Sequence, residues 1–386
     1  MNRSLLLLAA VLPIAVLKAD APGGYPGPLP RSVAQAPIAL LYDLSSGRTL
    51  YAHNGDARFL PASITKAMTL LVAFDRIKAG TLKEDTVFTV TPQTARQWSG
   101  KGTTLFLQQN EQITVAQLLA GIATASANDA AVVLAESASG SVPAWTDAMN
   151  DRARQLGMND SHFATPNGFP DGRATYVTAN DLVKLARALI NDHPAMYKRY
   201  INRAEIDWKG QRLTSHNPFV GQVAGGDGIK TGHTFEAGFN FLGSVQRDGR
   251  RLVVVVGGVW TAPERAQASR DLAEWGFAEW EGRLWLRPER TVGHVRVQQG
   301  TIRALPVAVP TSYLMTVPRG ATGRASGEIV YAGPLVAPIP KGAKVGELRV
   351  SVDGSLPYSL PLVATEQVKR AGPLDRVVNG LLGLGR

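Results

Sequence analysis

The sequence has no cysteine among its 386 residues, which excludes disulfides, thiol nucleophiles and cysteine-ligated metal or iron–sulfur sites. Its six histidines form neither a His-Glu-x-x-His run nor a close pair, so a zinc peptidase is disfavoured. No Gly-x-Gly-x-x-Gly loop follows a predicted strand. Gly100–Thr104 lacks the upstream glycine of a phosphate loop, and we predict a surface loop there. We therefore expect no metal and no cofactor.

Charge is also sparse, because only 19% of the residues are charged while 45% are hydrophobic. Such a chain can bury a sizeable core and is not broadly disordered. The 41 basic residues outnumber the 31 acidic ones, which gives a formal net charge of +10. No basic run interleaved with aromatic residues occurs, so we expect no nucleic-acid partner. A diffuse positive field suits an anionic membrane or wall surface.

The N-terminal residues have the layout of a secretory signal. A short basic start at Met1–Ser4 precedes the apolar run Leu5–Leu17, and Ala19-Asp20-Ala21 offers a cleavage site. Cleavage there would remove two basic residues and one acidic residue, taking the net charge from +10 to +9. The alternative is an uncleaved N-terminal anchor. We expect the mature protein to be exported.

Hydrophobic periodicity and turn residues predict strands, then helices, then strands and a closing helix. The expected elements are a hairpin over 38–52, helices over 61–78, 115–122, 129–137 and from 178, a hairpin over 238–260, and a helix over 263–280. This order predicts an α/β (α+β) domain with helices packed on a mainly antiparallel sheet.

After Gly282 the composition shifts to valine, proline and glycine, with alternating segments and no helical period. This pattern predicts a small all-β domain. The tail carries an apolar stripe at helical spacing, from Leu374 to Leu382, that fits either a membrane surface or the protein's own domain. The expected organisation is a signal at 1–21, an extended lead-in at 22–36, an α/β domain at 37–282, a β-sandwich-like domain at 283–365 and an amphipathic tail at 366–386.

A serine and a lysine three residues apart, Ser63 and Lys66, stand at the start of the helix predicted over 61–78. Residues at this spacing lie on one helix face, so the amine can reach the hydroxyl. A helix N-terminus also has free backbone N–H groups that can hold an oxyanion. Alone, the motif is weak, because a surface serine near a solvated lysine is the commoner situation.

Two further elements follow in chain order, Ser126-Ala127-Asn128 and Lys230-Thr231-Gly232. With Ser63 and Lys66 they make the active-site set of penicillin-recognising serine enzymes. A second Ser-x-Asn occurs at 215–217, but Ser126 is preferred because it lies at a predicted helix–helix junction.

These residues and their context resemble the low-molecular-mass penicillin-binding proteins that are serine-type D-alanyl-D-alanine carboxypeptidases (peptidase S11). The matching stretches are Pro61–Thr69, Ser126–Ala131 and Asp227–Thr234, with the Asn167-Gly168 turn in support. The resemblance covers roughly 35–281. It implies a β-lactamase/transpeptidase-like fold and removal of terminal D-alanine from the peptidoglycan pentapeptide stem, with β-lactams as covalent inhibitors. It also implies a periplasmic enzyme attached peripherally to the outer face of the inner membrane through its tail.

The resemblance assigns catalytic roles to Ser63, Lys66 and Ser126. Ser63 would attack the penultimate carbonyl and form an acyl-enzyme. Lys66 would be the base, and burial together with the nearby Lys230 cation would lower its pKa toward the neutral form. Ser126 would relay a proton toward the leaving amine.

Substrate-binding roles follow by the same resemblance. Asn128 would hold Lys66 and a substrate amide, Lys230 and Thr231 would meet the terminal carboxylate, and Gly232 would let the strand approach the peptide. The backbone N–H groups of Ser63 and His233 would form the oxyanion hole.

Arg265 matches the position of an arginine that helps to bind the terminal carboxylate, although an ordinary helix-surface arginine is the alternative. No glutamate occurs between Leu156 and Thr178, where class A β-lactamases carry their deacylating base. We therefore expect penicillin to acylate Ser63 and stay bound. A D,D-endopeptidase, a weak β-lactamase and a non-catalytic envelope-binding protein of the same fold remain alternatives.

Overall fold

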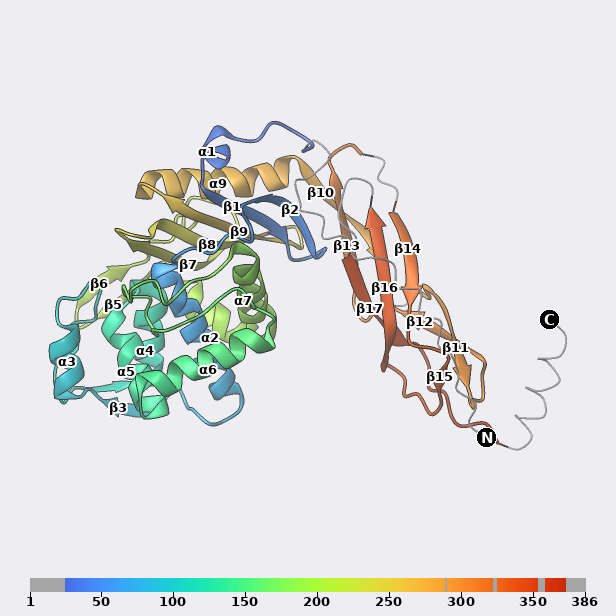
Figure 1. Ribbon diagram of the computed structural model, residues 1–386, viewed down its shortest axis with the longest axis horizontal. Helices are drawn as coiled ribbons and strands as arrows, with labels where there is room; N and C mark the ends of the chain where they lie inside the picture. The colour runs from blue at the N-terminus through green and yellow to red at the C-terminus, as the bar shows by residue number, and fades with distance from the viewer. Residues whose placement is uncertain (1–24, 289, 322–324, 353–357, 373–386) are drawn as a thin grey trace, which may run out of the picture.

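The computed structural model describes residues 25–288, 290–321, 325–352 and 358–372. The signal predicted at 1–21 and the stripe predicted from Leu374 lie outside the described residues. Figure 1 shows an α/β part followed by an elongated all-β part, which agrees with the predicted fold class.

The centre of the α/β part is a five-stranded antiparallel sheet in the order β2-β1-β9-β8-β7. Its strands are β1 (Ile38–Asp43), β2 (Arg48–His53), β7 (Gly226–Thr234), β8 (Gly238–Arg247) and β9 (Arg250–Val259). The predicted Asp248-Gly249 turn joins β8 to β9, and both residues have positive φ. β7 is an edge strand, so within the described ranges one side of its backbone has no sheet partner.

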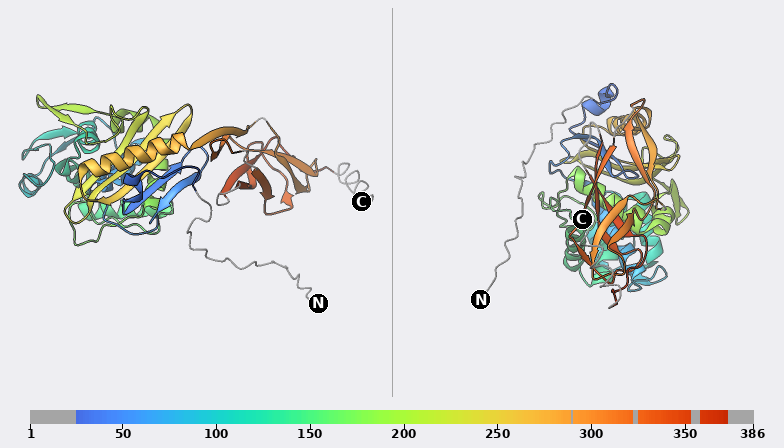
Figure 2. Two further views of the ribbon diagram at one scale, coloured as in Figure 1. Left: turned by 90° about the horizontal axis from the view of Figure 1, so that it is seen from above. Right: turned by 90° about the vertical axis from the view of Figure 1, so that its right-hand side faces the viewer.

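Helices cover both faces of the sheet, which explains the unbroken apolar run Leu252–Val256 in β9. Val253 and Val255 lie in the core under the large helical layer, while Val254 and Val256 lie in a second core under α9 (Ala262–Ala278). Figure 2 shows α9 crossing its face of the sheet. Along the predicted extended lead-in, Arg31–Ala34 instead form a helical turn, α1, because Val33 is buried beside α9.

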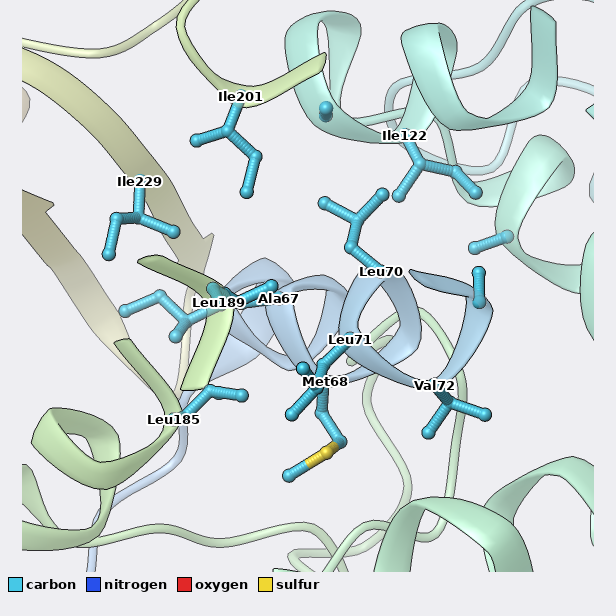
Figure 3. Close-up of a cluster of buried hydrophobic side chains, with 14 of the residues drawn as sticks. Ala67, Met68, Leu70, Leu71, Val72, Ile122, Leu185, Leu189, Ile201 and Ile229 are labelled. Carbon is cyan, nitrogen blue, oxygen red and sulfur yellow. The ribbon is translucent and has the colours of Figure 1, made fainter. Parts of the chain in front are cut away.

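The helical layer surrounds α2, whose Ala67, Met68, Leu70 and Leu71 are buried among side chains from the neighbouring helices (Figure 3). Its helices are α2 (Thr65–Lys78), α3 (Pro92–Trp98), α4 (Val115–Ala120), α5 (Asn128–Ser139), α6 (Val142–Gln155), α7 (Ala179–Asp192) and α8 (Pro194–Met196), with shorter turns η1 (Ala62–Ile64), η2 (Gly121–Ala125) and η3 (Tyr197–Ile201). Two small hairpins complete this part: β3 (Val87–Thr89) with β4 (Gln112–Thr114), and β5 (Glu205–Trp208) with β6 (Gln211–Thr214).

The helix predicted over 263–280 ends earlier, at Ala278, because Trp280 begins β10. The all-β part then contains β10 (Trp280–Leu286), β11 (Gly293–Gln298), β12 (Ala304–Ala308), β13 (Tyr313–Pro318), β14 (Ala325–Val330), β15 (Leu335–Val336), β16 (Lys344–Val352) and β17 (Tyr358–Ala364). Six of them form one sheet in the order β14-β16-β17-β12-β11-β15, and β10 pairs with β13. Val368 is buried against this sheet and pairs with Ile339.

A buried polar cluster ties the two parts together. The Asp43 carboxylate accepts hydrogen bonds from Arg250 Nε at 2.6 Å and from Thr316 Oγ1 at 2.7 Å, and Arg48 Nη1 donates to the Thr316 carbonyl at 2.5 Å. All four residues are buried, so β13 is fixed against β1 and β2. Among the described residues, no helix combines the length and the apolar content that a membrane crossing requires.

Candidate active site

Ser63 lies in the single turn η1, directly before α2, as the motif predicted. Ala62 before it has φ +47°, in the left-handed region, so the chain bends sharply as it enters the turn. The Ser63 side chain is only half-buried while Ala62 and Ile64 on either side are buried. The turn therefore presents the hydroxyl on an otherwise packed surface.

Lys66 is fully buried one turn further on, and its amine has three polar neighbours. The Lys66 Nζ atom lies 2.7 Å from Ser63 Oγ, 2.7 Å from Asn128 Oδ1 and 2.8 Å from the Asn167 carbonyl oxygen. The two carbonyl oxygens can only accept, whereas a hydroxyl can also donate. A neutral amine can donate its two N–H groups to the two carbonyl oxygens. Its lone pair can then accept the proton of the Ser63 hydroxyl.

The surroundings favour that neutral amine. Burial, followed by the nearby Lys230 cation, holds the pKa of Lys66 well below its usual value. The buried Asp129 carboxylate opposes this shift, but its pKa is itself raised by burial. Asp129 accepts hydrogen bonds from the backbone N–H groups of Leu105 and Leu107, which weakens it as a partner for the amine.

Ser126 and Asn128 lie on the other side of Lys66, at the junction between η2 and α5. Ser126 is buried and has φ +62°, so the backbone reverses direction there, and Asn128 begins α5 with its amide oxygen on Lys66. Among the described residues, Ser126 makes no side-chain hydrogen bond to Ser63 or Lys66. The alternative Asn217 accepts a hydrogen bond from the backbone N–H of Phe219 rather than one from Lys66.

The segment Gly100–Thr104 is a surface loop, as predicted, with residues 100–103 exposed, and it also packs on the site. Thr104 is buried, the Lys101 carbonyl accepts a hydrogen bond from Asn128 Nδ2 at 2.8 Å, and the Thr103 carbonyl accepts one from Asn128 N–H at 2.8 Å. Nothing in the sequence indicated that this loop also covers the first turn of α5. It fixes the amide orientation that directs Asn128 Oδ1 at Lys66.

The edge strand β7 brings Lys230, Thr231, Gly232 and His233 against the serine turn. A Cβ built on Gly232 would lie 2.2 Å from the Pro61 carbonyl oxygen, so only glycine allows this approach. Lys230 and Thr231 are buried, whereas the exposed His233 ring stacks on Phe239 with centroids 3.8 Å apart. The β7 backbone and Ser63 therefore border the same space.

Lys230 and Arg265 form a cationic pair beside β7. Burial and the Arg265 charge lower the pKa of Lys230 to about 7, and burial lowers the pKa of Arg265 to about 10. In the part of the chain that the structure describes, Lys230 donates only to the Thr231 carbonyl, at 3.2 Å, and Arg265 only to the His216 carbonyl, at 3.3 Å. Among the described residues neither forms an ion pair. Two buried cations without a carboxylate partner make a site for an anionic group.

Two supporting residues were not identified from the sequence. Asn167 supplies its backbone carbonyl to Lys66, and this contact has no side-chain signature, although the Asn167-Gly168 pair marks the turn. Asn240 is fully buried in β8; its Nδ2 donates to the Leu60 carbonyl at 3.1 Å and its Oδ1 accepts from Gly258 N–H at 2.8 Å. Asn240 therefore links β8 to the segment that precedes η1. A polar residue within a mostly apolar strand was the sequence feature that could have identified it.

Two family models match this chain, and they cover its α/β part and its all-β part. Residues 29–261 match the family described as D-alanyl-D-alanine carboxypeptidase, and residues 284–370 match the C-terminal domain of penicillin-binding protein 5. The D-alanyl-D-alanine carboxypeptidase DacA of Haemophilus influenzae is 31% identical over 355 residues, covering 92% of this chain and 90% of the relative.

Solved structures of penicillin-binding proteins also resemble this chain. Penicillin-binding protein 5 from Haemophilus influenzae superimposes with a TM-score of 0.78 and 31% identity, over 89% of this chain and 100% of its own. Penicillin-binding protein D2 from Listeria monocytogenes, solved in an ampicillin-bound form, gives a TM-score of 0.58 and 30% identity, over 65% of this chain and 99% of its own.

Proposed function

Because this chain belongs to the family of serine-type D-alanyl-D-alanine carboxypeptidases, we propose that it removes the terminal D-alanine of peptidoglycan pentapeptides through an acyl-enzyme on Ser63. The observation that carries the assignment to these residues is the buried Lys66 amine, 2.7 Å from Ser63 Oγ and held on its other side by two carbonyl oxygens. This arrangement makes a hydroxyl nucleophilic without histidine or metal.

In the acylation step the Ser63 proton passes to Lys66 Nζ while Ser63 Oγ bonds to the carbonyl carbon of the penultimate D-alanine. The resulting oxyanion accepts hydrogen bonds from the N–H groups of Ser63 and His233. The peptide C–N bond then breaks, and the proton reaches the leaving nitrogen by way of Ser126. Free D-alanine departs and the ester remains on Ser63.

The cationic pair explains why the enzyme acts at the end of a peptide. A C-terminal carboxylate placed between Lys230 and Arg265 gains two charge-assisted partners that otherwise have only backbone carbonyls. Thr231 adds a hydroxyl next to them. An internal peptide bond has no such carboxylate and would leave both cations buried and unpaired.

Water then hydrolyses the ester, and Lys66 is the base available for this step. The segment 156–178 contains no glutamate, and its contact with Lys66 is the Asn167 carbonyl. β-Lactams acylate Ser63 in the same way, but their ring-opened product stays attached. We expect slow deacylation of this adduct, because the leaving group remains tethered in the site where water must approach the ester.

The place of action follows from the substrate. The protein acts on the outer side of the cytoplasmic membrane, in the periplasm, where residues 1–21 direct it and the apolar stripe from Leu374 holds it at the membrane surface. Cell fractionation and N-terminal sequencing of the mature protein test this location, with Pro22 as the expected first residue.

The assigned chemistry is tested by adding a penicillin, measuring the intact mass and mapping the modified peptide. One adduct on Ser63 is expected, together with release of D-alanine from a muropeptide pentapeptide. Ser63→Ala should lose both, Ser126→Ala should slow both, and Ser215→Ala, in the alternative Ser-x-Asn set, should leave both unchanged. Absence of an adduct, or rapid turnover of a chromogenic β-lactam, would contradict the proposal.

A further inference from the structure

The edge strand β7 begins with a bulge three residues before Lys230. The ladder pairs Gly226 and Gly228 with two consecutive residues of β8, so Asp227 between them is an extra residue. A bulge interrupts the backbone hydrogen bonds, and in the sheet that the structure describes β7 has a neighbouring strand on one side only. The ladder therefore fixes the start of this strand weakly, and side-chain contacts have to supply the rest.

Two side chains hold the Asp227 carboxylate at this bulge. The hydroxyl of Tyr197, the first residue of η3, donates to Asp227 Oδ1 at 3.0 Å, and Arg251 Nη1 donates to Asp227 Oδ2 at 2.7 Å. Burial, together with the charge of Asp227, holds the pKa of Tyr197 well above its usual value, so this hydroxyl remains a donor. A Cβ built on Gly228 would lie 2.6 Å from the Tyr197 hydroxyl oxygen, so the hydroxyl packs directly on the β7 backbone.

The two partners of Asp227 belong to different layers of the molecule. Arg251 lies in β9 and also donates to Ser244 Oγ of β8 at 2.6 Å, so it connects strands within the sheet. Tyr197 is buried in the helical layer, whose hydrophobic core includes α2, and Ser63 lies directly before that helix. Of the two partners, Tyr197 is therefore the one that ties β7 to the layer that carries the nucleophile.

We propose that Tyr197 is a positioning residue for the terminal carboxylate of the substrate. It acts through β7: the hydroxyl holds the bulge at Asp227, and the bulge sets where Lys230 lies relative to Ser63. Among the described residues Lys230 has no ion pair, and its amine makes one hydrogen bond, to the Thr231 carbonyl at 3.2 Å, so it depends on the backbone for its place. The inference rests on the proposed function.

Tyr197→Phe tests this role, because it removes the hydroxyl and keeps the buried ring. For the peptide Nα,Nε-diacetyl-L-lysyl-D-alanyl-D-alanine we expect KM to rise about three- to tenfold and kcat to change by less than about twofold, since the carboxylate is bound both before and during the reaction. The same peptide with a C-terminal carboxamide lacks the charge that Lys230 binds. Its inhibition constant as a competitor should change by less than about twofold.

Tyr200→Phe is the matched control. Tyr200 is buried in the same turn, but its hydroxyl donates to Glu84 rather than to β7, so this variant should leave KM and kcat unchanged. Urea denaturation of both variants separates a general loss of stability from the change in KM. An unchanged KM in Tyr197→Phe, an equal rise in Tyr200→Phe, or an equal weakening of the carboxamide peptide would overturn the positioning role while the carboxypeptidase activity stands. Absence of D-alanine release from the unaltered protein would overturn the proposed function, and this inference with it.

Discussion

Replacing Gly168 by alanine should disable the enzyme through the backbone that supports the site. Gly168 has φ +71°, and a Cβ built on it would lie 1.9 Å from the Ala62 carbonyl oxygen and 2.8 Å from Thr65 Oγ1. The loop that carries the Asn167 carbonyl and the turn that carries Ser63 therefore touch at this glycine. Alanine must push them apart by at least about 1 Å to reach an ordinary contact distance.

The same loop provides a matched control. Gly172 has φ +69°, but a Cβ built there meets nothing within 4 Å. Gly172→Ala should cost only the left-handed strain, about 1 kcal/mol of the free energy of unfolding, and leave kcat/KM unchanged. Gly168→Ala adds the steric conflict, so we expect a loss of about 2–4 kcal/mol.

Because a displacement of about 1 Å in a catalytic geometry typically costs about a hundredfold in rate, kcat/KM of Gly168→Ala should fall by about that factor. The measurements are D-alanine release, the second-order rate constant of penicillin acylation and urea denaturation of both variants. If Gly168→Ala matches Gly172→Ala in all three, the contact between the loop and the serine turn does not support catalysis, and the reasoning is refuted.

Three further predictions concern charged groups. The pKa of Lys230 is lowered from 10.5 to about 7, so between these pH values the unfolded chain binds more protons than the folded one. The free energy of unfolding should therefore rise from about pH 7 to about pH 10. In urea denaturation, Lys230→Met should show a smaller rise over this range. Arg265→Gln should raise KM for D-alanyl-D-alanine peptides about ten- to a hundredfold, with a smaller effect on kcat. Because Arg265 helps to lower the pKa of Lys230, the variant should also move the basic limb of the pH profile of kcat/KM to higher pH. An unchanged KM would contradict this prediction. Asp43→Asn breaks a buried pair with Arg250 and should cost about 3–5 kcal/mol of stability while kcat/KM at 25 °C stays unchanged; thermal unfolding and D-alanine release measure the two effects.

Elements with local signals could be predicted from the sequence. The helix predicted over 61–78 begins as the turn η1 at Ala62, continues as α2 from Thr65 and ends at Lys78. As predicted, α4 begins after the Thr114 cap and α7 after the Thr178 cap. The contact between Ser63 and Lys66 could be predicted from their three-residue spacing, because one helical turn brings residues at this spacing together.

Contacts set by tertiary packing could not be predicted in this way. The Asn167 carbonyl on Lys66 is a backbone atom 101 residues away in the chain, and any residue type could supply it. The exposure of Gly100–Thr104 was predicted correctly, but the hydrogen bonds from this loop to Asn128 depend on where the chain returns after α3. A depression beside the serine turn is lined by segments near Ala62, Phe169 and Thr234, which lie far apart in the chain and meet only through the tertiary fold.

The central claim is that Lys66 is neutral when it takes the Ser63 proton, and its titration is the most direct test. In enzyme labelled with carbon-13 at the lysine side chains, the Cε resonance of Lys66 can be assigned by its loss in Lys66→Arg and followed with pH. We predict that Lys66 titrates at a pH well below the ordinary range of a lysine side chain. Titration of Lys66 together with the exposed lysines, near the ordinary value of about 10.4, would contradict the account.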